Sequence, residues 1–321
     1  MKKNNGNILK TVKRMRYSGR TINRVFIIAM LLQAFAGMGA LGAAEDTALY
    51  WSVNRDGRHV GYLLGTIHSE DPRVLDFPAG FVSQLTSSQL FAMEMVPDLP
   101  TLKRLTEYMH YQDGKTLESQ VGPDRFALLQ PVLSLYGMPD DWISRMKVWA
   151  AMLTLSVPPP ETGFFMDFSL SLRAAGAGLK VVGLETLEQQ LSFLEDMPLA
   201  QQLALLDQAL EDYDKVEEIH LQMVENYLNG NLQKLTLEAE AQLGQLAPDT
   251  RQYFLEQGID ARNLRMLESL LPHFESGRVF IAVGALHLPG EKGLINLLRQ
   301  RGFDLQPREL PFSGGAPVSN P

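Results

Sequence analysis

Two stretches of this chain, LLGTIH at residues 63–68 and AVGALH at residues 282–287, decide how it folds. Each ends an apolar, β-prone run, so each is predicted to be a strand that closes in a glycine turn and projects a histidine, His68 or His287. Ligands of open α/β sheets bind at the carboxyl ends of the strands. We therefore expect the two histidines to share one site. The alternative is that both histidines lie in ordinary loops and are exposed to solvent.

The surroundings of the two turns repeat. A helix at residues 79–87 and a strand at residues 89–96 are predicted after His68, and a helix at residues 293–301 and a strand at residues 303–310 after His287. Both halves thus have the order strand, Gly-x-x-His, helix, strand, as after an old duplication. The predicted fold is α/β, with the two halves forming one central sheet and large helical insertions between them.

The first 44 residues are predicted to be a secretory signal. Residues 1–24 hold eight basic and no acidic residues, and the apolar run at residues 25–44 ends in the small residues Gly42 and Ala44. An uncleaved membrane anchor is the alternative, since the run approaches the ~20 residues that span a bilayer. We expect a periplasmic or secreted protein, with one domain at residues 45–312 and a disordered tail at residues 313–321.

Charge and composition exclude several classes of function. Eight of the 29 basic residues and none of the 37 acidic residues lie in the first 44 positions, which leaves a net charge of −16 on the remainder. Proteins that bind nucleic acid need a basic surface, so no nucleic-acid partner is expected. The chain has no cysteine, which excludes disulfides, thiolate metal ligands and a cysteine nucleophile.

Two acidic residues are predicted at strand ends. Glu94 interrupts the apolar strand at residues 89–96, and a buried carboxylate needs a partner, which His68 would provide. Glu185 follows a short strand at residues 180–182. The alternative for Glu94 is that it is simply an exposed charge at a strand end. The alternative for Glu185 is that it belongs to a helix N-terminal cap around Thr186.

Two long helices are predicted between the halves, at residues 197–227 and 249–274. In the second helix, Asn263 falls on the apolar face, where a buried amide needs hydrogen-bond partners such as a site histidine or carboxylate. The neighbouring Arg262 could stabilise an oxyanion or pair with Glu94 or Glu185. Solvation on the helix surface is the alternative for Arg262.

Together these phrases resemble the TraB/PrgY/GumN family, whose relatives include the Tiki proteases. The resemblance runs from about residue 50 to residue 310, and it rests on the ordered phrases LLGTIH, Met93-Glu94, GLET at residues 183–186, Arg262-Asn263 and AVGALHLPG at residues 282–290. The family is similar in fold to erythromycin esterase-like and haem-binding ChaN-like proteins. The resemblance therefore implies an α/β core with helical insertions.

The Tiki resemblance implies a metal-dependent peptidase in which His68, Glu94 and His287 hold a divalent ion. Imidazole and carboxylate ligands suit Mn, Co, Zn or Fe about equally. In this interpretation metal-bound water is the nucleophile, Glu185 is the general base and Arg262 stabilises the oxyanion. The substrate would be a peptide or a small molecule.

Two other functions stay open at this stage. Esterase-like relatives imply a metal-free hydrolase in which His68, placed next to Glu94, activates a water molecule. ChaN-like relatives imply a protein that binds haem, a metal or a peptide without turnover. In every case we expect His68, Glu94, Glu185 and His287 to converge in one pocket, with Arg262 and Asn263 at its rim.

Overall fold

The computed structural model describes residues 47–310. Both predicted terminal segments, residues 1–44 and 313–321, lie outside these residues. Within the described part, no helix is long and apolar enough to cross a membrane.

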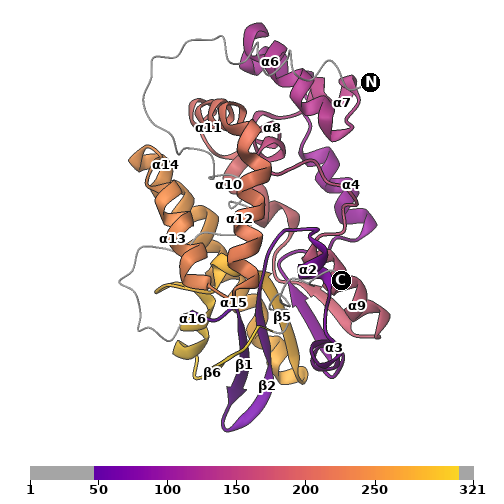
Figure 1. Cartoon of the computed structure of the whole chain (residues 1–321), viewed down its shortest axis with the longest axis vertical. Helices are drawn as coiled ribbons and strands as arrows, with labels where there is room; N and C mark the ends of the chain where they lie inside the picture. Colours follow the sequence, from indigo (N-terminus) through magenta and orange to yellow (C-terminus); the bar gives the residue numbers. More distant parts are fainter. Residues whose placement is uncertain (1–46, 311–321) are drawn as a thin grey trace, which may run out of the picture.

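One six-stranded sheet forms the base of the molecule, in the order β4-β3-β5-β2-β1-β6 (Figure 1). Strand β1 is antiparallel to both of its neighbours and the other pairs are parallel, so five strands run in the same direction. The predicted α/β fold with one central sheet is confirmed. The strands are β1 (Tyr50–Arg55), β2 (Arg58–Thr66), β3 (Leu90–Met93), β4 (Lys180–Gly183), β5 (Val279–Gly284) and β6 (Asp304–Arg308).

Strands β2 and β5, which carry the two Gly-x-x-His turns, are parallel neighbours. Gly65 pairs with Val283 and Thr66 pairs with Gly284, so both strands end at the same level. Strand β1 joins β2 through a tight hairpin at Asp56-Gly57, where both residues have positive φ, 50° and 70°. The sheet therefore brings together two turns that lie more than 200 positions apart in the sequence.

The chain leaves β2 and β5 in opposite directions. After β2 it crosses to β3, on the far side of β5, and after β5 it crosses to β6, beyond β2 and β1. The two predicted halves are thus interleaved, and their second strands lie on opposite sides of the sheet. Adjacent strands with opposite connections form a switch point, where open α/β sheets bind their ligands.

The two faces of the sheet are covered by helices from different halves. Tyr50 of β1 packs against Phe81 of helix α3 (Ala79–Thr86), with ring centroids 5.8 Å apart. The next residue, Trp51, points to the other face, where Arg299 of helix α16 (Leu294–Gln300) lies 5.6 Å above its ring. Alternating side chains on one strand thus fix the two helical layers.

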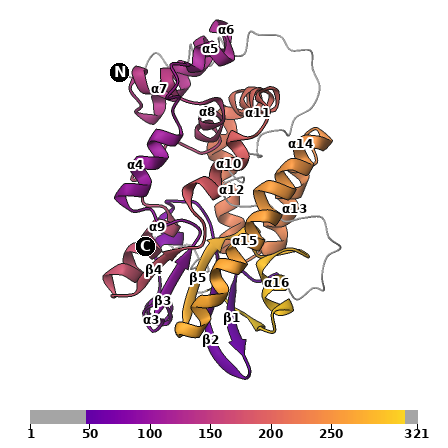
Figure 2. The same cartoon turned by 180° about the vertical axis from the view of Figure 1, so that it is seen from behind.

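The helical insertions stand mostly beyond the carboxyl ends of the parallel strands, as Figures 1 and 2 show from opposite sides. The remaining helices are α2 (Pro72–Leu75), α4 (Leu99–Tyr108), α5 (Leu117–Val121), α6 (Pro123–Leu133), α7 (Asp140–Arg145), α8 (Val148–Leu155), α9 (Met166–Gly176), α10 (Leu187–Glu195), α11 (Leu199–Asp212), α12 (Val216–Leu228), α13 (Leu232–Leu243), α14 (Pro248–Tyr253) and α15 (Ala261–Leu270).

Both long helices predicted for the middle of the chain are interrupted. Residues 197–227 form α11 and α12, joined by the 3₁₀ turn Tyr213–Lys215. Residues 249–274 form α14, the π-helical segment Phe254–Asp260, α15 and the start of the 3₁₀ segment Leu271–Ser276. Apolar residues at steps of three or four fit α, 3₁₀ and π turns alike, so spacing does not reveal these breaks. The π segment ends at Asp260, two residues before Arg262.

Candidate functional site

The two Gly-x-x-His turns touch each other at the carboxyl edge of the sheet. A Cβ atom on Gly65 would lie 2.9 Å from Cα of Ala285 and 2.7 Å from Cδ1 of Leu288. The turn after β2 therefore needs a glycine because the turn after β5 is pressed against it. The carbonyl of Gly65 accepts a hydrogen bond, 2.8 Å long, from the buried hydroxyl of Tyr227 on α12.

Glu94 and Glu185 leave neighbouring strand ends. Glu94 follows β3 directly, so it lies beyond the strand rather than inside it as predicted. The backbone N–H of Glu185 donates to the Glu94 carbonyl at 2.8 Å, which continues the pairing of β3 and β4. Thr186 does form a capping box with Gln189 at the start of α10, so the cap and the site acid coexist.

Arg262 joins the two carboxylates. Its Nη2 lies 2.7 Å from Oε2 of Glu94 and 2.7 Å from Oε2 of Glu185, and its Nε donates to the same Glu185 oxygen at 2.9 Å. Arg262 and Glu185 are buried, so surface solvation is excluded for Arg262. One guanidinium serves two carboxylates in a water-poor interior, where an unpaired charge would cost several kcal/mol.

Glu94 has further partners on both sides. Its Oε1 accepts from the backbone N–H of Gly284 at 2.8 Å, and its Oε2 accepts from Nε2 of Gln190 at 3.2 Å. The Glu94 side chain is 13 % exposed, so part of it reaches solvent. Its partners are Arg262, Gln190 and Gly284, and not His68 as predicted.

The pKa values of the ion-paired groups follow from burial and charge. Burial alone would lower the pKa of Arg262, but the carboxylates of Glu94 and Glu185 raise it above its ordinary value, so the guanidinium is charged. Burial raises the pKa of Glu185, and the positive charges of Arg262 and Arg265 offset part of that rise.

His287 lies fully buried beside this ion-pair network. Its Nδ1 is 2.5 Å from Oδ1 of Asn263, whose Nδ2 donates to the Lys292 carbonyl at 2.9 Å. The amide oxygen is an acceptor, so the ring carries its proton on Nδ1. Burial, and then the nearby Arg262, lower the pKa of His287 well below its ordinary value. His287 is therefore neutral, with a free lone pair on Nε2.

That lone pair faces Glu94. The His287 Nε2 atom lies 3.7 Å from Oε1 of Glu94 and has no hydrogen-bond partner among the described residues. Two acceptor atoms thus face one another inside the protein, and neither has a proton to donate to the other. A histidine with its Nδ1–H bonded to an amide oxygen also has the tautomer that metal ligands adopt.

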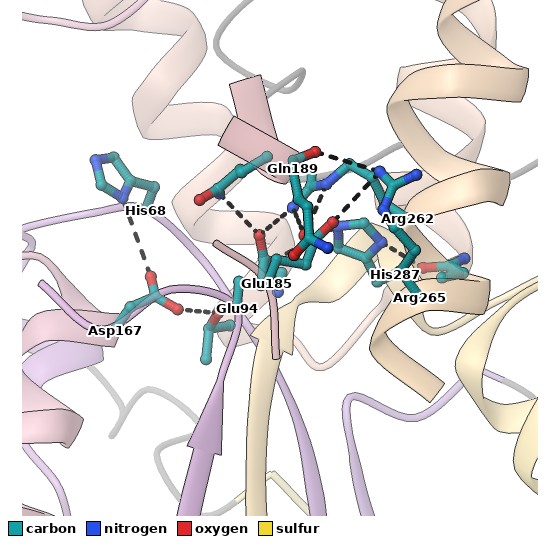
Figure 3. Close-up of polar contacts among 12 residues, drawn as sticks. His68, Glu94, Asp167, Glu185, Gln189, Arg262, Arg265 and His287 are labelled. Atoms are coloured by element: carbon teal, nitrogen blue, oxygen red, sulfur yellow. Dashed lines mark hydrogen bonds and ion pairs between the residues drawn. The ribbon is translucent and has the colours of Figure 1, made fainter. Parts of the chain in front are cut away.

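His68 occupies a different part of the strand edge. Figure 3 shows it beside Asp167, apart from the group formed by Glu94, Glu185, Arg262 and His287. Its Nδ1 lies 4.0 Å from Oδ2 of Asp167, and its ring stacks on Phe165 with centroids 3.7 Å apart. The Asp167 Oδ1 atom accepts a hydrogen bond from the Thr66 hydroxyl. The side chains of His68 and Asp167 are 35 % and 28 % exposed, so both reach solvent.

The environments of His68 and Asp167 move both pKa values. The ring of His68 is partly buried, and this loss of solvation, followed by the neighbouring His220, lowers its pKa to about 4. Partial burial likewise raises the pKa of Asp167 to about 7, and the negative charge of Glu94 adds to this rise. At neutral pH His68 is therefore neutral, while Asp167 is partly protonated.

The structure brings five of the six predicted site residues together: Glu94, Glu185, Arg262, Asn263 and His287. Arg262 and Asn263 lie at the buried base of the cluster rather than at its rim. The sixth, His68, stands apart with Asp167. The turns do adjoin, as predicted, but the two imidazoles point into different environments because α9 supplies a separate partner for His68.

The predicted metal site of His68, Glu94 and His287 is not assembled. Among residues 47–310, no group of three or more His, Cys, Asp or Glu side chains is arranged to hold a metal ion. Glu94 and His287 provide two facing donor atoms, but His68 is directed at Asp167, and the Arg262 guanidinium already neutralises Glu94. The three residues therefore do not fit a metal in this arrangement.

Asp167, Gln190 and Phe165 are site residues that the sequence did not reveal. An acidic residue in the first turn of a helix is common because it favours the helix dipole, so Asp167 carries no distinctive signal. Gln190 lies one residue beyond an ordinary capping box. Phe165 directly precedes α9 and looks like any apolar residue at a helix start.

Several known proteins are similar in sequence to this chain over most of its length. The chain is 24 % identical over 252 residues to Uncharacterized protein YbaP of Shigella flexneri, covering 77 % of this chain and 90 % of that protein. It is 23 % identical to Metalloprotease TIKI1 of Danio rerio, covering 82 % of this chain and 63 % of that protein. It is 22 % identical to a Metalloprotease TIKI homolog of Nematostella vectensis, covering 81 % of this chain and 68 % of that protein.

No solved structure matches the chain. The family model for the TraB/PrgY/gumN family matches residues 49–307, which include every site residue described above. The resemblance read from the sequence is therefore confirmed: the chain belongs to the TraB/PrgY/gumN family.

Proposed function

We propose that this protein hydrolyses peptide or ester bonds at the open part of the strand edge, where His68 and Asp167 face solvent. One observation carries the proposal. Of the charged and imidazole groups gathered at this edge, His68, Asp167, Arg265 and part of Glu94 are accessible, while Arg262, Glu185 and His287 are buried. A substrate would therefore meet His68 and Asp167 first.

In this mechanism His68 is the general base. Its ring is neutral at pH 7 and has its Nδ1 near Asp167, so a free lone pair can accept a proton from an attacking water. Stacking on Phe165 fixes the plane of the ring. A fixed orientation of the base lowers the entropy cost of the reaction.

Asp167 is the general acid. Its raised pKa, about 7, leaves the carboxyl partly protonated at neutral pH, so it can give a proton to the leaving amine or alkoxide. Glu94 supports this role, because its negative charge is held in place by Arg262 and helps to keep the proton on Asp167. The buried network thus acts on the reaction through the pKa of Asp167.

The names of the relatives favour a metal-dependent peptidase, whereas the donor arrangement around His68 favours proton transfer between protein groups. Hydrolysis of a fluorogenic peptide and of p-nitrophenyl acetate by the purified protein, in EDTA and then with Mn²⁺ or Co²⁺ added, separates these two functions. We expect turnover in EDTA that is lost in H68A. Turnover that appears only with the metal would overturn the proposed mechanism.

The pH dependence gives a second test. The reaction needs neutral His68 and protonated Asp167, so the rate should rise through about pH 4 and fall through about pH 7. In D167N the fall above pH 7 should disappear together with most of the rate. A rate that keeps rising to pH 9 in the wild-type protein would contradict the assignment of Asp167 as the acid.

We also propose that the chain is exported. The basic residues and the apolar run of the first 44 residues support this, as they are typical of a secretory signal. Expression in a Gram-negative host, followed by fractionation and N-terminal sequencing, is expected to find the protein in the periplasm or medium, beginning at Glu45. A full-length product in the membrane fraction would indicate an anchor instead.

A further inference from the structure

Phe165 and Asp167, which flank the His68 ring, come from one short segment at the start of helix α9. Phe165 directly precedes α9, and Asp167 lies in its first turn. The Phe165 ring stacks on the imidazole with planes 18° apart, and Oδ2 of Asp167 lies 4.0 Å from its Nδ1. The geometry around the proposed base therefore depends on where this segment lies.

The loop that leads into this segment is not held by burial. Residues 159–164 are exposed, and residues 157–165 form neither helix nor strand. Pro158, Pro159 and Pro160 carry no N–H group, so the next hydrogen-bond donor of the backbone is Glu161. Because the core does not fix this loop, hydrogen bonds have to fix it.

The carboxylate of Glu70 accepts those hydrogen bonds. Its Oε2 accepts from the backbone N–H groups of Glu161 and Thr162 at 3.1 and 2.8 Å, and from the Thr162 hydroxyl at 3.0 Å. Its Oε1 accepts from the N–H of Gly163 at 2.7 Å. The Thr162 hydroxyl oxygen in turn accepts from the N–H of Phe164 at 3.1 Å, which extends the hydrogen bonds towards α9. Successive N–H groups that converge in this way form a nest for an anion.

Glu70 lies on the same turn as His68. It follows the histidine by two residues, and the carbonyl of the intervening Ser69 accepts a hydrogen bond, 3.1 Å long, from the N–H of Met166. The turn that carries the histidine therefore binds the start of α9 directly, and Glu70 adds a charged anchor for the exposed loop before it.

We propose that Glu70 is a positioning residue of the hydrolytic site: its carboxylate fixes the loop at residues 161–163, and the loop places Phe165 against the imidazole of His68. The inference rests on the proposed hydrolase function for its effect on the rate, whereas the contact between the two rings can be measured without turnover. A base held in a fixed plane reacts at a lower entropy cost, so loss of these hydrogen bonds should lower kcat more than it changes KM.

NMR spectroscopy of the full-length protein tests the position of the loop. An aromatic ring stacked on the imidazole shifts the His68 ring protons upfield, and F165L gives the signal expected when this stacking is lost. E70Q replaces one acceptor oxygen by an NH₂ group that faces N–H donors, so we expect the His68 signal to move towards its position in F165L. The carboxylate in E70D keeps its charge but is one methylene shorter, so it should reach fewer donors and give an intermediate signal.

Hydrolysis of p-nitrophenyl acetate by the same variants tests the effect on the reaction. We expect kcat to fall by about 10–10²-fold in E70Q, with KM changed by less than about twofold, and kcat to fall by less in E70D. E225Q is the matched control, because it also loses a carboxylate hydrogen bond, 2.6 Å long, but one that is donated by Arg73 and not by the loop. This control should keep the wild-type His68 signal and the wild-type kcat.

The results separate the role of Glu70 from the proposed function. A His68 signal that stays at its wild-type position in E70Q, or that moves equally in E225Q, would overturn the inference, whether or not the protein hydrolyses the ester. A shifted signal with an unchanged kcat would also overturn it, because the loop would then not position the base. If the wild type hydrolyses no ester or peptide, the proposed function fails, and the His68 signal alone decides whether Glu70 holds Phe165 in place.

Discussion

The two Gly-x-x-His turns share their local structure and differ in what surrounds them. Both follow parallel, hydrogen-bonded strands and both end at the same level of the sheet. The side chain of His287 is completely buried, whereas that of His68 is 35 % exposed. Helix α15 supplies Asn263 and Arg262 around His287, while α9 and its loop supply Asp167 and Phe165 beside His68.

This difference separates two tasks. The turn after β5 belongs to a buried network that holds the Glu94 carboxylate, and with it a negative charge, in a fixed position. The turn after β2 presents a histidine to solvent. An interior network of this kind stabilises only when every charge is paired, so its members are sensitive to substitution. A group at the open edge tolerates substitution structurally, and its loss is expected to affect the reaction.

Removal of Arg262 should have the largest effect on stability. R262A leaves the carboxylates of Glu94 and Glu185 buried without their cation, which should cost about 3–5 kcal/mol of the free energy of unfolding. Urea denaturation followed by circular dichroism measures this loss. The control is R265A. The Arg265 side chain is 38 % exposed and lies 3.5 Å from Glu185, so its removal should lower the free energy of unfolding by less than about 1 kcal/mol. Equal losses in both variants would argue against the buried network.

The single substitutions H68A and H287A should distinguish a residue that acts in hydrolysis from one that stabilises the fold. H68A is expected to keep its stability within about 1 kcal/mol and to lose about 10²–10⁴-fold in hydrolysis rate. H287A leaves the Asn263 oxygen without its donor and opens a cavity, so it should lose about 1–3 kcal/mol of stability. The comparison would break down if H68A were the less stable variant of the two.

Asp167 should cost the protein stability at alkaline pH. Its pKa is about 7 in the folded protein and 3.8 for the unperturbed group, so the folded state binds the proton more tightly. The stability contributed by the protonated carboxyl is complete below about pH 4 and is lost as pH rises through about 7. Because asparagine does not ionise, D167N should be more stable than the wild type by about 1–3 kcal/mol at pH 8.

Thermal unfolding of D167N and the wild type at pH 4 and at pH 8 checks this linkage. The difference between the two proteins should grow with pH and be small at pH 4. The amide oxygen of the asparagine in D167N can still accept a hydrogen bond from the Thr66 hydroxyl. The stability difference therefore does not include the loss of that hydrogen bond. If D167N were less stable than the wild type at pH 8, the raised pKa of Asp167 would be contradicted.

The smallest expected effect concerns His220. Its Nε2 lies 3.0 Å from the Ser69 hydroxyl, and its positive charge, when protonated, lowers the pKa of His68. In H220Q that repulsion is gone, so the pKa of His68 should rise by less than about one pH unit. Titration of the His68 ring by NMR measures the change. A fall in this pKa would contradict the proposed coupling.

Several elements could be predicted from sequence because their signals are local. The apolar runs before both histidines and the helices after them, observed as α3 and α16, follow from patterns among a few neighbouring residues. The meeting of β2 and β5 at one edge was also predicted, although it is non-local, because two similar phrases implied one shared edge. Breaks in the long helices were missed, since apolar spacing is similar across α, 3₁₀ and π turns.

The sequence by itself determined which residues would stand at the strand ends, since glycine turns and strand patterns act over short distances. Only the tertiary structure decided which of them would meet. Arg262 reaches two carboxylates, and Asn263 reaches His287, because α15 crosses the edge of the sheet at that point. His68 instead meets Asp167 because the first turn of α9 lies at the end of β2, where Asp167 accepts a hydrogen bond from the Thr66 hydroxyl. Whether a histidine is buried or exposed, and where its pKa lies, depends on the burial and charge that such distant segments contribute.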